Sequence, residues 1–366
     1  MNVLLVTLID NYNLGNRLQH LALQTELEKL GNQVSNVIYK KDTIPYNRNK
    51  QRVKKVLYRI GIKKYWNKVV AAEGKFKKFE AFTNKYIKSQ IATDLNSVFS
   101  KNWSAFDCAV VGSDQVWHNW HEQFNTAPDK DLSYFYLEFM PKNKRVAYAP
   151  SFGFTEFPAE DREEHIKGLN GMAVLSCREK DGCELIKRET GREAEWVLDP
   201  TLLLEKGDWD KIANKPSYDV PNRFLLLYFL GNITEEYQAK IDEVAEKYQL
   251  KVINILSPET YPDYYQTAPD EFIYLVSHAS FICTDSFHAT VFSIIYGKNF
   301  ISFRRQQEGF MNMFGRIGDL LESTELVDHE YEKDRIPINN VVDALARLRT
   351  RRIASIEYLK KTIVKL

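Results

Sequence analysis

An apolar run at 279–283, a polar turn at 284–290 and an apolar helical pattern at 291–296 follow one another without interruption. This succession predicts a buried strand that runs directly into a helix, with Asp285 or Ser286 as the helix N-cap. Such a unit is the building block of a parallel α/β sheet. The turn also points backbone amides and the positive end of the helix dipole at one spot, which suits a phosphate or a carboxylate.

His288 falls in the first turn of the predicted helix, where it can reach an anion bound at that spot. The alternative is an ordinary capped junction in which the histidine only packs. The rest of the chain favours an anion site, because strands that end in polar loops recur along it.

The same succession opens the chain. Residues 3–9 form an apolar run, 18–30 carry leucines at helical spacing, and 33–39 are the next predicted strand. The loop after the first run lacks the GxGxxG fingerprint, so a nicotinamide cofactor has no support. Its amides and one guanidinium lie at the carboxyl end of a strand, where open α/β sheets bind ligands, although they can also simply shape the turn. The candidate acceptor-binding residues here are Asn16, Arg17 and Gln19.

Polar loops also follow the apolar runs at 105–111 and 173–177. In the first loop, Ser113, Asp114 and Gln115 can bind sugar hydroxyls, with Trp117 as a stacking surface; the alternative is that the serine and aspartate are helix caps. In the second loop, Arg178 directly follows the strand and suits a bidentate contact with phosphate or carboxylate. Its alternative is a surface ion pair with Glu179, which contributes little.

The alternating pattern predicts two Rossmann-like α/β domains that face a cleft, with a C-terminal amphipathic helix. A chain of 366 residues suits two domains of ordinary size. We expect the first domain at 1–205 and the second at 206–330. A helix within 331–366 is expected to brace the first domain, or alternatively to mediate a homodimer.

A basic helical insertion is expected at 45–90. Between 48 and 78, twelve Lys or Arg residues accompany a single acid, Glu73, with apolar and aromatic residues interspersed. Such a stretch is usually a solvated helical face, and the alternative is a surface that contacts anionic lipid headgroups or a lipid-linked diphosphate. No recognisable module favours nucleic acid.

Overall composition excludes several other classes. The net charge is +1, and the four cysteines form no CxxC pair, so neither a zinc site nor a disulfide framework is expected. Neither a signal peptide nor a stretch of membrane-spanning length is visible, which predicts a cytoplasmic protein, with peripheral contact at the inner face of the cell membrane as an option.

Five motifs in register resemble the polysaccharide pyruvyl transferase family. They are NYNLGNRLQ at 11–19, GSDQVW at 112–117, SCRE at 176–179, VLDPT at 197–201 and TDSFHAT at 284–290. The resemblance implies a GT-B-like fold and the transfer of pyruvate from phosphoenolpyruvate to a sugar. The product is a cyclic ketal on a capsule, exopolysaccharide or lipid-linked precursor.

The resemblance also implies site residues. Arg178 matches a donor-binding arginine of the family, and His288 matches the histidine of an Arg-Leu-His triplet. Ser286 stands where that triplet has its arginine, so the chain lacks one guanidinium. The helix N-terminus with Thr284 and Ser286 can substitute for it, or Arg304 or Arg305 can reach in, or the donor differs.

The expected chemistry protonates the methylene carbon of phosphoenolpyruvate, so that a sugar hydroxyl can attack the neighbouring carbon. His288 is the predicted acid, because imidazole titrates near neutral pH; the alternative is a neutral hydrogen-bond donor to the anion. Asp114 is the predicted base toward the acceptor, and Arg178 is expected to stabilise the departing phosphate. No metal or cofactor is required.

Two other functions fit the sequence pattern. One is a GT-B glycosyltransferase that uses a sugar nucleotide, and the other is a non-catalytic member of a polysaccharide assembly complex. The acceptor sugar, the stereochemistry of the ketal and the oligomeric state do not follow from the sequence.

Overall fold

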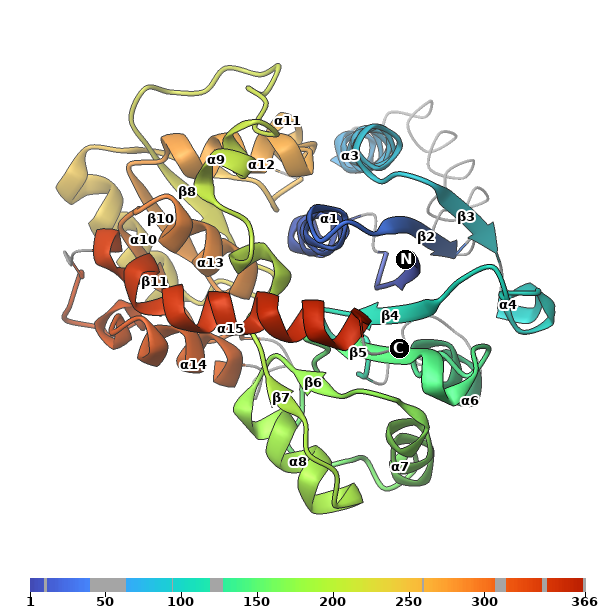
Figure 1. The fold of residues 1–366 in the computed structure, drawn as a ribbon. Helices are drawn as coiled ribbons and strands as arrows, with labels where there is room; N and C mark the ends of the chain where they lie inside the picture. The colour runs from blue at the N-terminus through green and yellow to red at the C-terminus, as the bar shows by residue number, and fades with distance from the viewer. Residues whose placement is uncertain are drawn as a thin grey trace.

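Two parallel sheets form the framework of the chain (Figure 1). The computed structural model describes residues 1–9, 12–39, 64–93, 95–118, 128–258, 260–306, 314–337 and 341–364. The first sheet has the order β3-β2-β1-β4-β5 and the second has the order β11-β10-β8-β9. Their strands are β1 (Asn2–Val6), β2 (Gln33–Tyr39), β3 (Gln90–Thr93), β4 (Cys108–Gly112) and β5 (Arg145–Tyr148), and β8 (Phe224–Tyr228), β9 (Lys251–Asn254), β10 (Phe281–Thr284) and β11 (Phe300–Ser302). The predicted fold class of two Rossmann-like α/β domains is confirmed by this topology.

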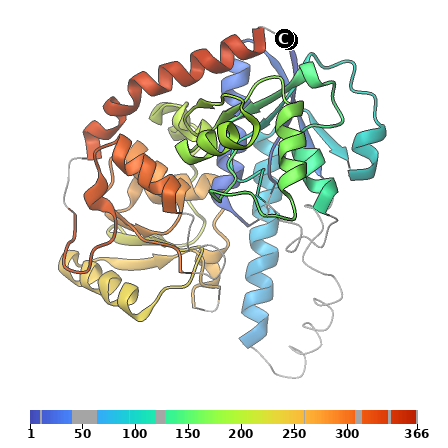
Figure 2. The ribbon, with the colours of Figure 1, turned by 90° about the horizontal axis from the view of Figure 1, so that it is seen from below.

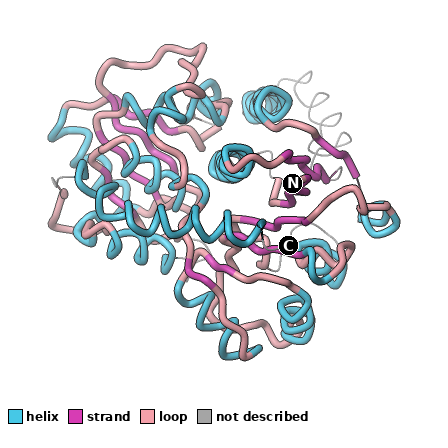
Figure 3. The backbone as a smooth tube through the Cα atoms, in the orientation of Figure 1, coloured by secondary structure: helices cyan, strands magenta, loops and turns pink. Residues whose placement is uncertain are grey.

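Helices lie between the strands in sequence and pack against the sheets (Figure 3). Those of the first half are α1 (Leu14–Lys29), α3 (Lys64–Tyr86), α4 (Leu95–Ser100), α6 (Pro128–Phe135), η2 (Lys142–Lys144), α7 (Arg162–Gly171), α8 (Lys180–Thr190), η3 (Pro200–Leu202) and α9 (Lys206–Asp210). Those of the second half are α10 (Glu235–Tyr248), α11 (Pro262–Tyr265), α12 (Pro269–His278), α13 (Phe287–Ile295), α14 (Gly315–Ser323), η5 (Val327–His329), η6 (Val341–Asp343) and α15 (Ala344–Val364). A small parallel pair, β6 (Ser176–Cys177) with β7 (Glu195–Trp196), follows the first sheet.

The first strand shows why the sheets are buried on both faces. Val3 and Leu5 of β1 point into one apolar cluster, whereas Leu4 and Val6 point into another. This alternation follows from the two-residue period of a strand. A strand that is apolar at every position therefore needs helices on both faces, as parallel sheets do.

The two domains share a continuous apolar core. One cluster contains Leu18 of α1 in the first domain together with Phe272 of α12 and Phe292 of α13 in the second. An apolar interface of this kind restricts relative domain motion. It also brings the start of α1 close to the start of α13, which decides where the polar residues at those two helix ends meet.

Helix α3 carries part of the predicted basic insertion, and some of its lysines contact the second domain. Lys75 is buried with its Nζ 4.6 Å from the ring centroid of Tyr265, and Lys78 forms a 2.7 Å ion pair with Glu271. These two charges therefore help to join the domains. Residues 45–63 of the predicted insertion lie outside the described residues, and its proposed contact with lipid stays a prediction.

The C-terminal helix α15 lies across both domains (Figure 2). Its Ser355 Oγ accepts a hydrogen bond of 3.0 Å from the backbone N–H of Leu198, beside β7. Its Arg351 donates to Ser323 Oγ of α14 at 2.9 Å, from the other domain. The helix thus contacts the first domain and also helps to fix α14. No helix within the described stretches is long and apolar enough to cross a membrane.

Candidate active site at the seam of the two domains

The predicted strand, turn and helix of the second domain are present, and the turn is held by its own side chains. Thr284, the last residue of β10, donates its hydroxyl to the backbone carbonyl of Tyr228 at 2.6 Å and accepts from the N–H of Ser286 at 3.0 Å. Ser286 occupies the N-cap position of α13, but its side chain makes no capping hydrogen bond. Thr284 therefore shapes the turn, and a donor-binding role for either residue stays a prediction.

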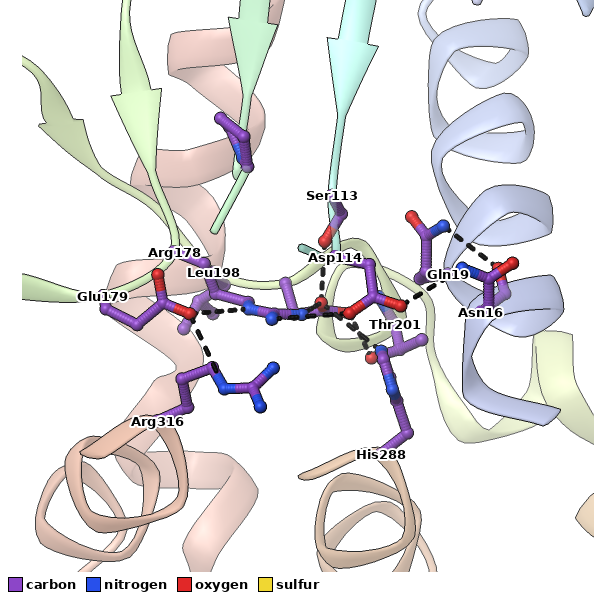
Figure 4. Close-up of polar contacts among 12 residues, drawn as sticks. Asn16, Gln19, Ser113, Asp114, Arg178, Glu179, Leu198, Thr201, His288 and Arg316 are labelled. Carbon is purple, nitrogen blue, oxygen red and sulfur yellow. Dashed lines mark hydrogen bonds and ion pairs between the residues drawn. The ribbon is translucent and has the colours of Figure 1, made fainter. Parts of the chain in front are cut away.

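His288 stands in the first turn of α13 and faces the first domain (Figure 4). Its side chain is 6% exposed, and Nε2 lies 3.6 Å from Asp199 Oδ2. Among the described residues, this buried nitrogen has no hydrogen-bond partner. The ring also packs against the start of α1, since a Cβ added at Gly15 would lie only 2.2 Å from Nδ1. The positive ends of two helices and one carboxylate thus face the same imidazole.

Arg178 is the centre of the first-domain side. Directly after β6, its guanidinium contacts three carboxylates: Asp199 Oδ2 at 2.8 Å, Glu179 Oε1 at 3.2 Å and Asp114 Oδ1 at 3.7 Å. Burial alone would lower the pKa of Arg178, but these carboxylates raise it above its usual value. The ring of Phe287, from the second domain, covers the guanidinium at 4.6 Å. Arg178 is therefore a fixed, permanent cation, and the alternative of a surface pair is wrong because its side chain is only 2% exposed.

Asp199 links the two halves of the site. Its Oδ2 accepts from Ser113 Oγ at 2.8 Å as well as from Arg178, and its Oδ1 accepts from the N–H and the hydroxyl of Thr201 at 3.0 and 2.6 Å. Burial would raise the pKa of Asp199, but His288, Arg178 and these hydrogen bonds lower it well below its usual range. Arg178 from one domain and His288 from the other therefore converge on one carboxylate oxygen.

Asp114 lies beside this cluster, at the carboxyl end of β4. Ser113 and Asp114 have φ values of 22° and 62°, so the chain turns sharply there in the left-handed region. Asn16, in the first turn of α1, donates to Asp114 Oδ2 at 3.2 Å. Burial raises the pKa of Asp114, but His288, Arg178 and Arg316 outweigh it and the net pKa is lowered. Asp114 is thus ionised at neutral pH, and Asn16 bridges the switch point between β1 and β4.

The other predicted acceptor residues on α1 are buried. Gln19 donates to Thr7 Oγ1 at 2.7 Å and to the backbone carbonyl of Asn16 at 3.0 Å, so its amide supports the loop before α1. Arg17 is 1% exposed. Gln115 is also buried, and a Cβ added at Gly153 would lie 2.2 Å from its Nε2. Two of the predicted acceptor residues, Asn16 and Ser113, donate hydrogen bonds to the carboxylates of the cluster.

The prediction that Trp117 offers a stacking surface to a sugar is wrong. Its side chain is fully buried, and its ring stacks on Tyr136 at 5.2 Å between ring centroids and packs against Phe152 at 5.0 Å. Both faces are therefore occupied by the core of the first domain. A tryptophan two residues beyond a polar loop looks identical in sequence whether it turns inward or outward.

The two arginines after β11 lie on different sides. Arg304 is 58% exposed and pairs with Glu330 at 2.6 Å, away from the cluster around Arg178. Arg305 is 14% exposed, and its Nε lies 3.6 Å from Asp285 Oδ2. Arg305 Nε is buried without a hydrogen-bond partner among the described residues, and its positive charge acts on Arg316. A donor-binding role for Arg304 or Arg305 stays a prediction.

Sequence reasoning missed three residues of the site, namely Asp199, Gly15 and Arg316. Asp199 and Gly15 stood inside the family motifs but were not assigned a role, whereas Glu179 was considered as the partner of Arg178. Arg316, at the start of α14, is 10% exposed and has its Nε 4.0 Å from Glu179 Oε1 (Figure 4). The VLDPT motif was a usable signal for Asp199, whereas the position of Arg316 follows from tertiary packing alone.

Three buried nitrogen atoms in this cluster have no hydrogen-bond partner among the described residues: Arg178 Nη2, His288 Nε2 and Arg316 Nε. Buried polar groups in native proteins are normally bonded, so such atoms mark a place where a ligand completes the network. All three are donors or can become donors, and they suit an anion that carries more than one negative group.

Comparison with known proteins gives one family and several remote structures. The polysaccharide pyruvyl transferase family matches residues 13–307. No protein of curated function matches the chain by sequence.

Among solved structures, UDP-GlcNAc 2-epimerase from Methanocaldococcus jannaschii is similar at 14% identity and a TM-score of 0.49, covering 97% of this chain and 99% of that chain. Acinetobacter baumannii MurG follows at 9% identity and 0.46, covering 100% and 99%. An alpha-glucosyltransferase in complex with UDP and DNA has 10% identity and 0.48, covering 100% and 99%.

Proposed function

The chain belongs to the polysaccharide pyruvyl transferase family, and we propose that it transfers pyruvate from phosphoenolpyruvate to a sugar of a surface polysaccharide or its lipid-linked precursor. The product is a cyclic ketal, and phosphate is released. The observation that carries this proposal is the convergence of Arg178 and His288, from two domains, on Asp199 Oδ2. A guanidinium and an imidazole at one spot suit a small donor with a phosphate and a carboxylate.

In the proposed mechanism, His288 is protonated and Asp199 is its counter-ion. Its Nε2 gives a proton to the methylene carbon of phosphoenolpyruvate, and the double bond supplies the electron pair. The neighbouring carbon becomes electrophilic, and the methylene becomes the methyl group of the product. Because Nε2 has no hydrogen-bond partner within the described residues, it is available to a bound donor.

Asp114 then receives the proton of the first sugar hydroxyl as its oxygen bonds to that carbon. Before this step Asp114 is ionised, in keeping with its lowered pKa, and orients the hydroxyl by accepting its hydrogen bond. The second hydroxyl closes the ring, the carbon–oxygen bond to phosphate breaks, and the proton of that hydroxyl leaves with phosphate. Asp114 then releases its proton to solvent and His288 takes one up, which restores both groups. Arg178 stabilises the charge on the departing phosphate through Nη2.

The sugar-nucleotide alternative has less support, because Asp285 occupies the switch point of the second sheet. That point lies between β8 and β10, where open α/β sheets bind ligands. Asp285 accepts hydrogen bonds from the backbone amides of Leu230 at 2.7 Å and Gly231 at 2.8 Å. These are the donors that a nucleotide phosphate would need there, and such a phosphate would also face the carboxylate.

The non-catalytic alternative rests on Ser286, which replaces an arginine of the family motif. Against it stands the retained cluster of Arg178, Asp199 and His288, which is costly to bury without a purpose. We propose an acceptor on a lipid diphosphate, which would make peripheral contact with the inner face of the membrane useful.

Two measurements test the proposed function. Phosphoenolpyruvate should raise the melting temperature of the purified protein, whereas UDP and GDP sugars should not. Phosphate release should then require both phosphoenolpyruvate and an acceptor, with lipid-linked galactose, glucose and mannosamine as the first candidates. A melting temperature that responds only to a sugar nucleotide would favour the glycosyltransferase. Binding of neither ligand, with no phosphate released, would favour the non-catalytic role.

A further inference from the structure

Arg316 enters the site from a helix that both domains hold in place. It is the second residue of α14. The backbone N–H of Lys180, at the start of α8, donates to Asp319 Oδ2 of α14 at 3.3 Å, and Arg347 of α15 donates to the carbonyl of Thr324 at 3.2 Å. Figure 4 shows the Arg316 side chain below Glu179, with its guanidinium turned toward the space between Arg178 and His288. The position of this cation is therefore set by the fold.

The surroundings of Arg316 differ from those of Arg178. Its Nε lies 4.0 Å from Glu179 Oε1, the outer limit of an ion pair, and has no hydrogen-bond partner in the described part of the chain. Glu179 is already engaged by Arg178 at 3.2 Å. Burial, together with the positive charges of Arg178 and Arg305, lowers the pKa of Arg316 to about 10. The Arg316 side chain is only 10% exposed and its Nε makes no hydrogen bond within the described residues, so an anion would complete its contacts.

The charge balance shows which groups remain for an anion. The carboxylates of Asp114, Glu179 and Asp199 all surround Arg178, whose Nη1 and Nε are already bonded. Arg178 therefore has one nitrogen, Nη2, left for a ligand. A donor with a phosphate and a carboxylate needs more than one such group, and the chain has Ser286 where the family motif supplies a second arginine.

We propose that Arg316 supplies the missing second guanidinium and binds one of the two anionic groups of the donor, opposite His288. This inference rests on the proposed function, since it names a further donor-binding residue for the same reaction. Ser286 is then tolerated at the N-cap of α13 because the positive charge arrives from α14. The site then keeps two guanidinium groups, Arg178 after β6 and Arg316 of α14, and only the second comes from a different element than the family motif implies.

The test is isothermal titration of phosphoenolpyruvate into wild type, Arg316→Gln, Arg316→Lys and Arg162→Gln. Arg162 is the matched control, a 54% exposed arginine that pairs with Glu189. We expect Arg316→Gln to raise the Kd at least about tenfold, the equivalent of about 1.4 kcal/mol. Arg316→Lys should raise it by less, and Arg162→Gln should leave it unchanged. Inorganic phosphate and pyruvate, titrated separately, show whether Arg316 binds the phosphate or the carboxylate of the donor. The ligand whose affinity falls more in Arg316→Gln carries the group that Arg316 binds.

Thermal melting without ligand separates donor binding from a structural role. Because Arg316 Nε is unbonded, Arg316→Gln should melt no lower than wild type. A lower melting temperature with an unchanged Kd would assign Arg316 a structural role and overturn the proposal. If Arg316→Gln does not fold, Arg316→Lys decides: a raised Kd supports the proposal and an unchanged Kd overturns it. If the wild-type protein does not bind phosphoenolpyruvate, the proposed function fails and this inference fails with it. If the wild-type protein binds phosphoenolpyruvate and Arg316→Gln has the same Kd, only the inference is overturned.

Discussion

The first-domain half of the site is held by more hydrogen bonds and ion pairs than the second-domain half. Around Arg178, the carboxylates of Asp199 and Asp114 accept hydrogen bonds from Ser113 and Asn16 in addition to the ion pairs, and Arg178 Nη2 is left unbonded. Across the seam, His288 Nε2 and Arg316 Nε are buried without a hydrogen-bond partner in the described stretches. The difference indicates that the first domain provides a bonded frame, whereas unbonded donors come from both domains.

This division has a physical basis. A buried network that is fully satisfied specifies a single arrangement, whereas an unsatisfied buried group costs free energy until a partner arrives. Proteins keep such costs at functional sites. Because Arg178 Nη2 belongs to the first domain and His288 Nε2 and Arg316 Nε to the second, a ligand bound by all three would add contacts between the two domains.

The largest effect is expected when the unbonded imidazole of His288 is removed. We expect His288→Ala to lower the rate of phosphate release by about 100- to 10,000-fold, because general acid catalysis contributes on that order. Its free energy of unfolding should change by only about 1 kcal/mol, the usual scale for a substitution that breaks no bonded network. Phosphate release and urea unfolding measure the two effects. An active variant would remove His288 from the mechanism.

Removing a member of the bonded frame should instead affect folding. Asp199→Ala leaves the Arg178 guanidinium without its 2.8 Å partner, and breaking a buried ion pair costs about 3–5 kcal/mol. Urea unfolding checks this value. Glu193→Ala is the control, because Glu193 and its partner Lys187 are 77% and 64% exposed and such pairs contribute less than about 1 kcal/mol. Equal losses in the two variants would contradict a special role for the frame.

The close contact between the start of α1 and His288 can be tested by a substitution at Gly15. A Cβ at this position would lie 2.2 Å from His288 Nδ1, so Gly15→Ala must shift the imidazole. We expect a loss of about 1–3 kcal/mol in the free energy of unfolding, as for other overpacked sites, together with slower phosphate release. Gly207→Ala is the matched control, because nothing lies within 4 Å of its added Cβ. A Gly15→Ala variant as active and as stable as Gly207→Ala would show that the two helix ends are not in close contact.

The pH dependence of the free energy of unfolding tests the contribution of the Asp114 carboxylate, and it is the smallest of the expected effects. The pKa of Asp114 is lowered in the folded state from its ordinary value of 3.8, so its contribution is fully present above that value and is lost as the pH falls through the lowered pKa. Each unit by which the pKa is lowered corresponds to about 1.4 kcal/mol. The difference in unfolding free energy between wild type and Asp114→Asn should therefore shrink from pH 6 toward acid, to roughly zero well below the ordinary value. A difference that is constant with pH would contradict the lowered pKa.

Much of the fold followed from local patterns. The strand at Gln33–Tyr39 was predicted at its observed residues, and in the second domain Thr234 caps α10 with its hydroxyl 3.2 Å from the N–H of Tyr237. These elements are set by side-chain periodicity and capping, which neighbours in sequence determine. The proposed domain limits, the acceptor and a homodimer stay predictions.

The site could be predicted in part. Arg178, Asp114 and His288 were expected to meet because each follows a predicted strand and the two domains were expected to face a common cleft. Trp117 was assigned wrongly, since alternation along a loop does not reveal which way a ring turns. Arg304 and Arg305 were equivalent in sequence, yet one pairs with Glu330 at the surface and the other with buried Asp285.

Local sequence patterns alone predict the two α/β units and the polar loops that end their strands. They also place Arg178 and His288 at those loops. Local periodicity and turn chemistry are enough for these features, because they act within a few residues along the chain. Only the tertiary structure decided that Asp199 joins Arg178 to His288, that Gly15 makes room for the imidazole, and that Arg316 enters from α14. These contacts depend on how two domains pack through a shared apolar core, and no short stretch of sequence encodes the distance between their helix ends.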